Sequence, residues 1–301
     1  MNASREPSSS PSRALRFGTV LAPARGAPEA PPEADHRAPL VEFCAALADA
    51  LGRSFEPQDF DDYPGLLAAM EEGALDVAWL PPIVAMRAAS TGRTLPIALP
   101  TRRGVSSFHS ALFTAVGSPV QRPTDLENVR VAWVDRQSAS GYLVIRAALR
   151  ARGIDLTRAF GEEQFLGSHA AVAQAVLEGM ADVGATFLHY EQGGKGIFRA
   201  GWGDSSVHII ARVGPIPADV IAAGVHVPVA EIRAVQRVLC ANLEPRLRSG
   251  AERLMQAEAF AVAESGHLRP LEELLDFLED RARPWESILP PPYAKLEEPS
   301  D

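Results

Sequence analysis

Apolar and polar residues follow two periods along the chain, one typical of strands and one typical of helices. Short runs of apolar and β-branched residues, such as 129–135 and 181–187, have the length of strands. Residues 40–51 carry apolar side chains every three or four positions and stop at Gly52, which predicts a helix. Because strands and helices alternate, the pattern predicts an α/β fold with largely parallel sheets.

The expected elements cover most of the chain. Strands are expected at 15–21, 54–56, 75–80, 95–99, 107–116, 129–135, 164–166, 181–187, 207–213 and 220–227. Helices are expected at 40–51, from Pro64, from Pro81, at 143–150, from Ser168, and over most of the chain after Pro228, where Leu271, Leu274, Leu275 and Leu278 form one face. Residues 1–13 are expected to be a flexible leader, and the Gly-rich residues 192–206 a surface loop.

The turn after the strand at 129–135 is a candidate anion site. Ser138-Ala139-Ser140-Gly141 leads from that strand into a helix, so several backbone N–H groups are expected to converge there. The helix dipole would add about half a positive charge at the same place. The alternative interpretation is that one of the two serines only caps the helix.

Two junctions between a helix and a strand are similar in sequence. Residues 72–78 read Glu-Gly-Ala-Leu-Asp-Val-Ala, and residues 178–184 read Glu-Gly-Met-Ala-Asp-Val-Gly. This similarity indicates two related α/β lobes, and a cleft between two lobes is a favourable place for a ligand.

Composition restricts the function classes. The chain has 301 residues, 47% of them hydrophobic, and a formal net charge of −9 without a long basic block, so no nucleic-acid partner is expected. No apolar run reaches the length of a membrane span, and no secretory signal is visible, which predicts a cytoplasmic protein unless a signal was removed to leave a periplasmic one. Cys44 and Cys240 lie in helical apolar patterns and are expected to be buried thiols.

Several fragments together resemble one known family. They are Leu15–Val20, Asp62-Tyr63, Asp76–Pro82, Phe108-His109-Ser110, Asp135–Tyr142, Gly167-Ser168-His169, Asp182–Ala185 and Pro215–Asp219. The set is similar to the phosphonate and phosphite substrate-binding proteins of ABC transporters, over roughly residues 14–245. The most specific part is Ser-x-Ser-Gly-Tyr followed by Gly-Ser-His and then Asp-Val-Gly-Ala.

The resemblance implies an architecture. It is the two-lobed α/β fold of type II periplasmic binding proteins, with a hinge of two crossing strands near 107–116 and 207–213. After the leader, lobe one would comprise 14–115 and 210–301, and lobe two would comprise 116–209.

The resemblance also implies a site for a tetrahedral anionic head in the cleft. The ligand-binding residues carried over by match are Tyr63, His109, Ser138, Ala139, Ser140, Gly141, His169, His189 and Asp219. The sequence differs from the family pattern at two of these positions. Ala139 replaces a frequent Thr, which removes one donor, and His189 stands where some members have a carboxylate that receives a ligand ammonium. An aminoalkyl phosphonate is therefore a doubtful ligand.

Three functions are compatible with these residues. The first is capture of a small phosphonate-like or phosphate-like oxyanion, for an ABC-transporter permease or a regulatory protein. The second is an enzyme on the same scaffold, in which His169 and His109 would perform acid–base chemistry on a small acid. The third is a ligand-sensing or interaction module with an altered cleft. His109, His169 and His189 could together bind Zn²⁺, but their spacing in the sequence is not that of a zinc site. No metal ion or other cofactor is therefore expected.

Overall fold

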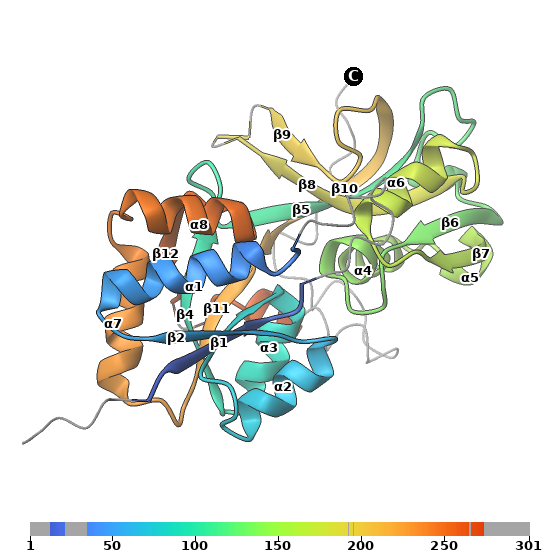
Figure 1. Cartoon of the computed structure of the whole chain (residues 1–301). Helices are drawn as coiled ribbons and strands as arrows, with labels where there is room; N and C mark the ends of the chain where they lie inside the picture. The colour runs from blue at the N-terminus through green and yellow to red at the C-terminus, as the bar shows by residue number, and fades with distance from the viewer. Residues whose placement is uncertain (1–12, 22–34, 192, 195, 265, 274–301) are drawn as a thin grey trace, which may run out of the picture.

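Two mixed sheets lie side by side in the computed structural model, which describes residues 13–21, 35–191, 193–194, 196–264 and 266–273 (Figure 1). Each sheet is covered by helices on both faces, as the alternating pattern predicts. No helix in these ranges is long and apolar enough to cross a membrane.

The first sheet has the strand order β12-β4-β11-β3-β1-β2. Its strands are β1 (Leu15–Thr19), β2 (Phe55–Asp59), β3 (Val77–Leu80), β4 (Thr94–Thr101), β11 (Val220–Gly224) and β12 (Ala259–Val262). Strands β2 and β3 run parallel to β1, whereas β11 and β12 are antiparallel to their neighbours. Helices α1 (Ala38–Leu51), α7 (Val229–Cys240) and α8 (Pro245–Met255) bury their apolar sides on one face, and α2 (Tyr63–Glu71) and α3 (Pro82–Ser90) on the other.

The second sheet has the order β10-β5-β8-β6-β7, with β9 paired to β8. Its strands are β5 (Ser107–Ala115), β6 (Val129–Trp133), β7 (Phe160–Phe165), β8 (Val183–Tyr190), β9 (Ile197–Ala200) and β10 (Val207–Pro217). One face packs against α4 (Val144–Ala151), which follows a π-helical turn at Ala139–Leu143, and the other against α6 (His169–Leu177). A short 3₁₀ turn, Pro123–Asp125, precedes β6, and a short helix, α5 (Leu156–Ala159), precedes β7.

The chain crosses between the sheets twice. It leaves the first sheet after β4 and enters the second at β5, and it returns from β10 to β11. The two strands expected to form a hinge, β5 and β10, pair antiparallel with each other inside the second sheet. The connections themselves are therefore the short segments 102–106 and 218–219.

Two expectations about secondary structure are wrong. Residues 197–200 form β9 within the stretch expected to be a loop, because they find a partner in β8. Residues 259–262 form β12 in a region expected to be helical, because they extend the first sheet beyond β4. Short edge strands are stabilised by pairing with a distant neighbour, and a local pattern does not record that neighbour. Residues 1–12 of the expected leader at 1–13, and Leu274, Leu275 and Leu278, lie outside the described residues.

The two similar junctions make the same contacts in both sheets. The Asp76 carboxylate accepts hydrogen bonds from the backbone N–H and the guanidinium of Arg16 on β1, at 2.8 and 3.0 Å. The Asp182 carboxylate accepts the same pair from Arg130 on β6, at 2.8 and 3.2 Å. Each arginine also donates to the glycine carbonyl three residues before its aspartate. The sequence similarity therefore marks an equivalent clamp between the first and third strands of each half.

The two clamps differ in burial, and this difference gives a prediction. Burial alone would raise the pKa of Asp76, but hydrogen bonds from Arg16, Arg13 and His226 hold it well below its usual value. Asp76 is fully buried, whereas the side chain of Asp182 is 36% exposed. We expect Asp76→Asn to lower the free energy of unfolding by about 2–4 kcal/mol, because it leaves the Arg16 guanidinium, whose side chain is 19% exposed, without its counter-ion. Asp182→Asn is the matched control and should lower the free energy of unfolding by clearly less.

Urea denaturation of both variants at neutral pH measures this difference. Because the folded-state pKa of Asp76 is depressed, its stabilisation is present above the unfolded-state pKa and is lost as the pH falls. Equal losses of unfolding free energy in the two variants would contradict the prediction that burial makes the Asp76 clamp the stronger one.

Candidate functional site

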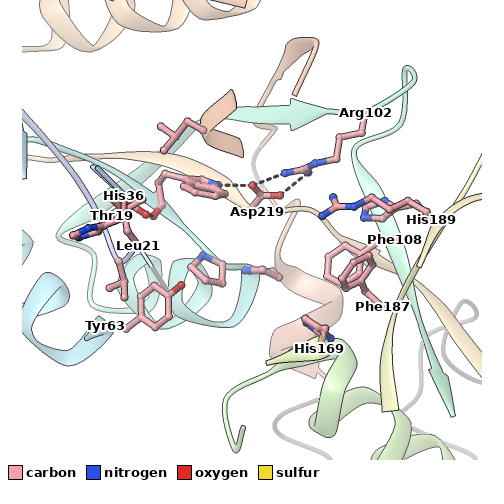
Figure 2. A pocket seen from close by; sticks show the side chains of 16 residues that line it. Thr19, Leu21, His36, Tyr63, Arg102, Phe108, His169, Phe187, His189 and Asp219 are labelled. Carbon is pink, nitrogen blue, oxygen red and sulfur yellow. Dashed lines mark hydrogen bonds and ion pairs between the residues drawn. The ribbon is translucent and has the colours of Figure 1, made fainter. Parts of the chain in front are cut away.

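A cavity of about 500 Å³ opens between the two sheets. Residues of both sheets line it: Thr19, Val20, Leu21, His36, Tyr63, Trp79, Pro81, Pro82, Arg102, Phe108, His169, Phe187, His189, Arg199, Asp219 and Leu254. Figure 2 shows these side chains facing one another across the space between the sheets. Many of them lie where a parallel strand ends or a helix begins, which is the usual position of a ligand site in α/β folds.

Tyr63 comes from the first turn of α2. Asp62 caps this helix by accepting a hydrogen bond from the Gly65 backbone N–H at 2.8 Å, which fixes where the ring leaves the backbone. Burial, together with the negative charges of Asp135 and Asp219, raises the pKa of Tyr63 to about 12. The hydroxyl therefore remains protonated and can donate a hydrogen bond.

His169 occupies the equivalent place at the start of α6. Ser168 caps this helix by accepting from the Ala171 N–H at 3.1 Å. The His169 Nδ1 lies 2.8 Å from the Thr186 hydroxyl, which leaves Nε2 for another partner. Burial and the charge of Arg199 lower the pKa of His169 to about 4, so the ring is neutral at physiological pH.

His189 lies among aromatic rings on β8. Its ring centroid is 5.7 Å from Phe108, 5.5 Å from Phe187 and 5.5 Å from Phe198. Burial and the charges of Arg102 and Arg199 lower the pKa of His189 to about 4. This second imidazole is therefore also neutral at physiological pH.

Asp219 and Arg102 join the two connections between the sheets. The Arg102 guanidinium donates to both oxygens of the Asp219 carboxylate, at 2.8 and 3.0 Å. It also donates to the Met255 carbonyl at 2.6 Å. The Trp79 indole N–H donates to the same carboxylate. The negative charge of Asp219 is thus neutralised by groups of the protein itself.

Arg199 brings a second positive charge to the cavity. It lies on β9 opposite His189 in the strand register, and its guanidinium carbon is 4.9 Å from the centre of the Phe187 ring. Burial and the charge of Arg102 lower the pKa of Arg199, while Asp219 acts in the opposite direction. Within the described ranges, Arg199 has no carboxylate partner. Among the arginine and carboxylate side chains of the described lining, Arg102 and Arg199 stand against Asp219, which leaves one net positive charge in a chain of net charge −9.

The structure brings together four of the residues expected at the site. Tyr63, His169, His189 and Asp219 all line the cavity. His109 does not, because side chains alternate along β5 and its neighbour Phe108 faces the cavity instead. His109 lines a different cavity of about 380 Å³ with Tyr190 and Arg212.

The turn at Ser138–Gly141 is packed behind the cavity lining. Ala139, Ser140 and Gly141 are buried. The Ser138 hydroxyl accepts from the Gly141 N–H at 3.0 Å, as in a helix cap. The Ser140 carbonyl accepts from the Ser110 hydroxyl at 2.6 Å, on the strand that carries Phe108. Ser138 thus caps the helix, and residues 138–141 are not among those that line the cavity.

Several lining residues were not singled out from the sequence. Trp79 lies on β3, and Arg199 lies in the stretch expected to be a surface loop. The long-range pairing that places β9 beside β8 leaves no local signal. In the part of the chain that the structure describes, no group of three or more His, Cys, Asp or Glu is arranged to hold a metal ion.

A family comparison identifies the group to which these features belong. The model of the ABC-transporter phosphonate periplasmic substrate-binding proteins matches residues 32–265. The chain belongs to this phosphonate-binding family. Its fold is accordingly that of the type II periplasmic binding proteins.

Solved structures agree with the family at the level of the fold. The protein XAC2383 of Xanthomonas citri, solved bound to ATP, is 20% identical, with a TM-score of 0.70 over 89% of this chain and 98% of that one. A binding-protein component of an ABC phosphonate transporter from Pseudomonas aeruginosa is 18% identical, with a TM-score of 0.67 over 88% and 86%. PhnD1 of Prochlorococcus marinus in complex with methylphosphonate is 16% identical, with a TM-score of 0.66 over 88% and 98%.

The buried histidines of this family member predict a pH dependence of stability. Because the folded-state pKa of His189 is about 4 and the usual value is 6.5, the unfolded chain binds the extra proton first as the pH falls. Stability should therefore decrease between about pH 6.5 and pH 4, by up to about 1.4 kcal/mol for each unit of pKa difference. His189→Phe should flatten this dependence in chemical denaturation. A variant that loses stability as steeply as the wild type would contradict the prediction.

Proposed function

We propose that this protein captures a small phosphonate-like or phosphate-like oxyanion between its two sheets and presents it to an ABC transporter. The observation that supports the proposal most strongly is the net positive charge of the cavity lining in an otherwise acidic chain. An anion that enters the cavity would compensate this charge in a region partly shielded from water. The family description, which is periplasmic, supports the role in transport.

The proposed anion site combines donors from both sheets. Tyr63 offers a hydroxyl from the first sheet, and His169 offers Nε2 from the second. The start of α6 adds backbone N–H groups and the positive end of its dipole. Closure of the sheets around the two short connections would bring these donors onto one ligand. The methylphosphonate in PhnD1 and the ATP phosphates in XAC2383 belong to the same chemical class.

We propose a supporting role for the turn at Ser138–Gly141. Asp135, which begins this turn, is near enough for its charge to raise the pKa of Tyr63. The turn therefore lies near Tyr63 of the first sheet. A modest closure would place its hydroxyls and N–H groups at the same ligand, as the family resemblance implies.

Capture fits the histidines better than acid–base catalysis does. An efficient catalytic acid or base has a pKa near the working pH. Of the two histidines expected to perform acid–base chemistry, His169 has a pKa of about 4, so its ring is not in the protonated acid form at neutral pH. The other, His109, does not line the cavity, and His189, which does, also has a pKa of about 4. Neutral imidazoles can still donate one hydrogen bond each to a bound anion.

Isothermal titration calorimetry tests the proposal directly. We expect phosphate, phosphite or methylphosphonate to bind, because each offers several acceptor oxygens and a negative charge to the positively charged cavity. Sulfate serves as an anion of similar shape. Absence of heat from every phosphorus oxyanion, in a protein that unfolds cooperatively, would contradict the proposal.

Tyr63→Phe tests the donor from the first sheet. Loss of the hydroxyl should weaken binding of methylphosphonate by about tenfold, the usual effect of removing a hydrogen bond to a charged group. Tyr142→Phe is the matched control, because Tyr142 packs against Trp133 and Phe165 away from the cavity. Equal affinities in the two variants would exclude Tyr63 from the site.

Ser140→Ala tests whether the packed turn joins the ligand on closure. If it does, the variant should bind methylphosphonate about ten to a hundred times more weakly, because a ligand oxygen loses a donor. The bond from Ser110 to the Ser140 carbonyl is unaffected by this change. Unchanged affinity, measured by the same calorimetry, would show that the turn has only a structural role.

A further inference from the structure

The two ends of the cavity differ in chemistry. In Figure 2, Tyr63 and His169 lie at one end, and Arg102, Asp219 and His189 lie at the other. The first end offers neutral donors, a hydroxyl and an imidazole. The second end contains the charged groups, so a ligand that spans the cavity would meet two different environments.

Within the part of the chain that the structure describes, the charged end has no free carboxylate. Asp219 is the one acidic residue among the described residues that line the cavity. Both of its oxygens accept from Arg102, and the Trp79 indole N–H donates to it as well. An ammonium group placed here would compete with a guanidinium for a carboxylate that already accepts three hydrogen bonds. It would also lie near the charge of Arg199.

Among the described residues that line the cavity, Arg199 is the cation without a carboxylate partner. It lies opposite His189 in the pairing of β8 and β9, and its charge acts on His189 together with that of Arg102, and on His169 as well. Its neighbour in space is the face of Phe187, a contact that holds the guanidinium without neutralising it. A partly buried cation without a counter-ion carries a desolvation cost that an anionic ligand group would offset.

We propose that the ligand carries a second anionic group, a carboxylate, which binds Arg199 while the phosphonate head binds at the Tyr63 and His169 end. This inference rests on the proposed function and specifies its substrate class. The ligand is a phosphonocarboxylate, in which a short carbon chain joins the two acidic groups. A planar carboxylate matches the guanidinium fork of Arg199, which can donate two parallel hydrogen bonds.

The aromatic wall supports the same assignment. Phe108 and Phe187 lie between the two ends and line the cavity with apolar surface. A short methylene chain would be buried there, whereas a single compact oxyanion would leave this surface in contact with water. The phosphonocarboxylate therefore satisfies the polar ends and the apolar middle together.

Calorimetry with a matched ligand series tests the proposal. The probes are methylphosphonate, 2-aminoethylphosphonate, phosphonoacetate and 3-phosphonopropionate. We expect one of the phosphonocarboxylates to bind the wild-type protein about ten to a hundred times more tightly than methylphosphonate. The aminoethyl compound should bind more weakly than methylphosphonate, because its ammonium meets two arginines.

Two variants assign the effect to Arg199. Arg199→Gln should abolish the preference for the phosphonocarboxylate over methylphosphonate, because only the phosphonocarboxylate loses a direct contact. Methylphosphonate should weaken less, since it loses only the attraction of the net charge of the cavity. Arg103→Gln is the control, because Arg103 is exposed, pairs with Glu191 and does not line the cavity. Circular dichroism on heating checks that both variants fold. If Arg199→Gln does not fold, the wild-type ligand series and Arg199→Lys, which keeps the charge and should retain part of the preference, decide the question.

The outcomes separate this inference from the proposed function. If methylphosphonate binds and no phosphonocarboxylate binds more tightly, the second anionic group is excluded and oxyanion capture stands. If Arg199→Gln weakens all four ligands equally, Arg199 binds the phosphonate head and the inference is overturned. If none of the four binds, both proposals fail.

Discussion

The arrangement of the cavity depends on the ion pair between the Asp219 carboxylate and the Arg102 guanidinium. Asp219 lies in the segment that returns the chain from the second sheet, and Arg102 lies in the segment that leaves the first. Their ion pair ties the two connections together, and Trp79 and the Met255 carbonyl anchor it to β3 and to the end of α8. Any closing motion of the sheets must take place around this group of bonds. Its burial makes it a pair that is costly to break by removing one member.

The same contact decides the charge of the site. Asp219 is the one carboxylate of the described cavity lining and is paired with Arg102, so Arg199 provides the excess charge of that lining. Burial then keeps His169 and His189 neutral, with the charge of Arg199 acting on both rings and that of Arg102 acting on His189. A neutral imidazole donates a hydrogen bond without adding charge, so the field in the cavity comes from one identifiable group. This is why a single substitution at that position separates the proposals about ligand class.

The two halves of the fold build their sides of the site with the same local structure. In each half, an arginine on the first strand clamps an aspartate before the third strand, and a capped helix begins beside the cavity. Parallel strands place all their carboxyl ends at one edge, so the clamps orient the edges that carry Tyr63 and His169. The repeated heptapeptides were visible in the sequence because the clamp needs a glycine, an acidic residue and a fixed spacing between them.

The sequence by itself determined the α/β class, nearly all of the strands and helices, the repeated junctions and four of the cavity residues, because these depend on short-range periodicity, caps and turn residues. The tertiary structure alone decided which face of β5 meets the ligand space, so that Phe108 lines it and His109 does not. The tertiary structure alone also brings Arg199 to the cavity, through the pairing of β9 with β8. It alone pairs Asp219 with Arg102, which is more than a hundred residues away in the chain. Charge balance in a cavity is a sum over residues from distant segments, and local sequence patterns do not contain that sum.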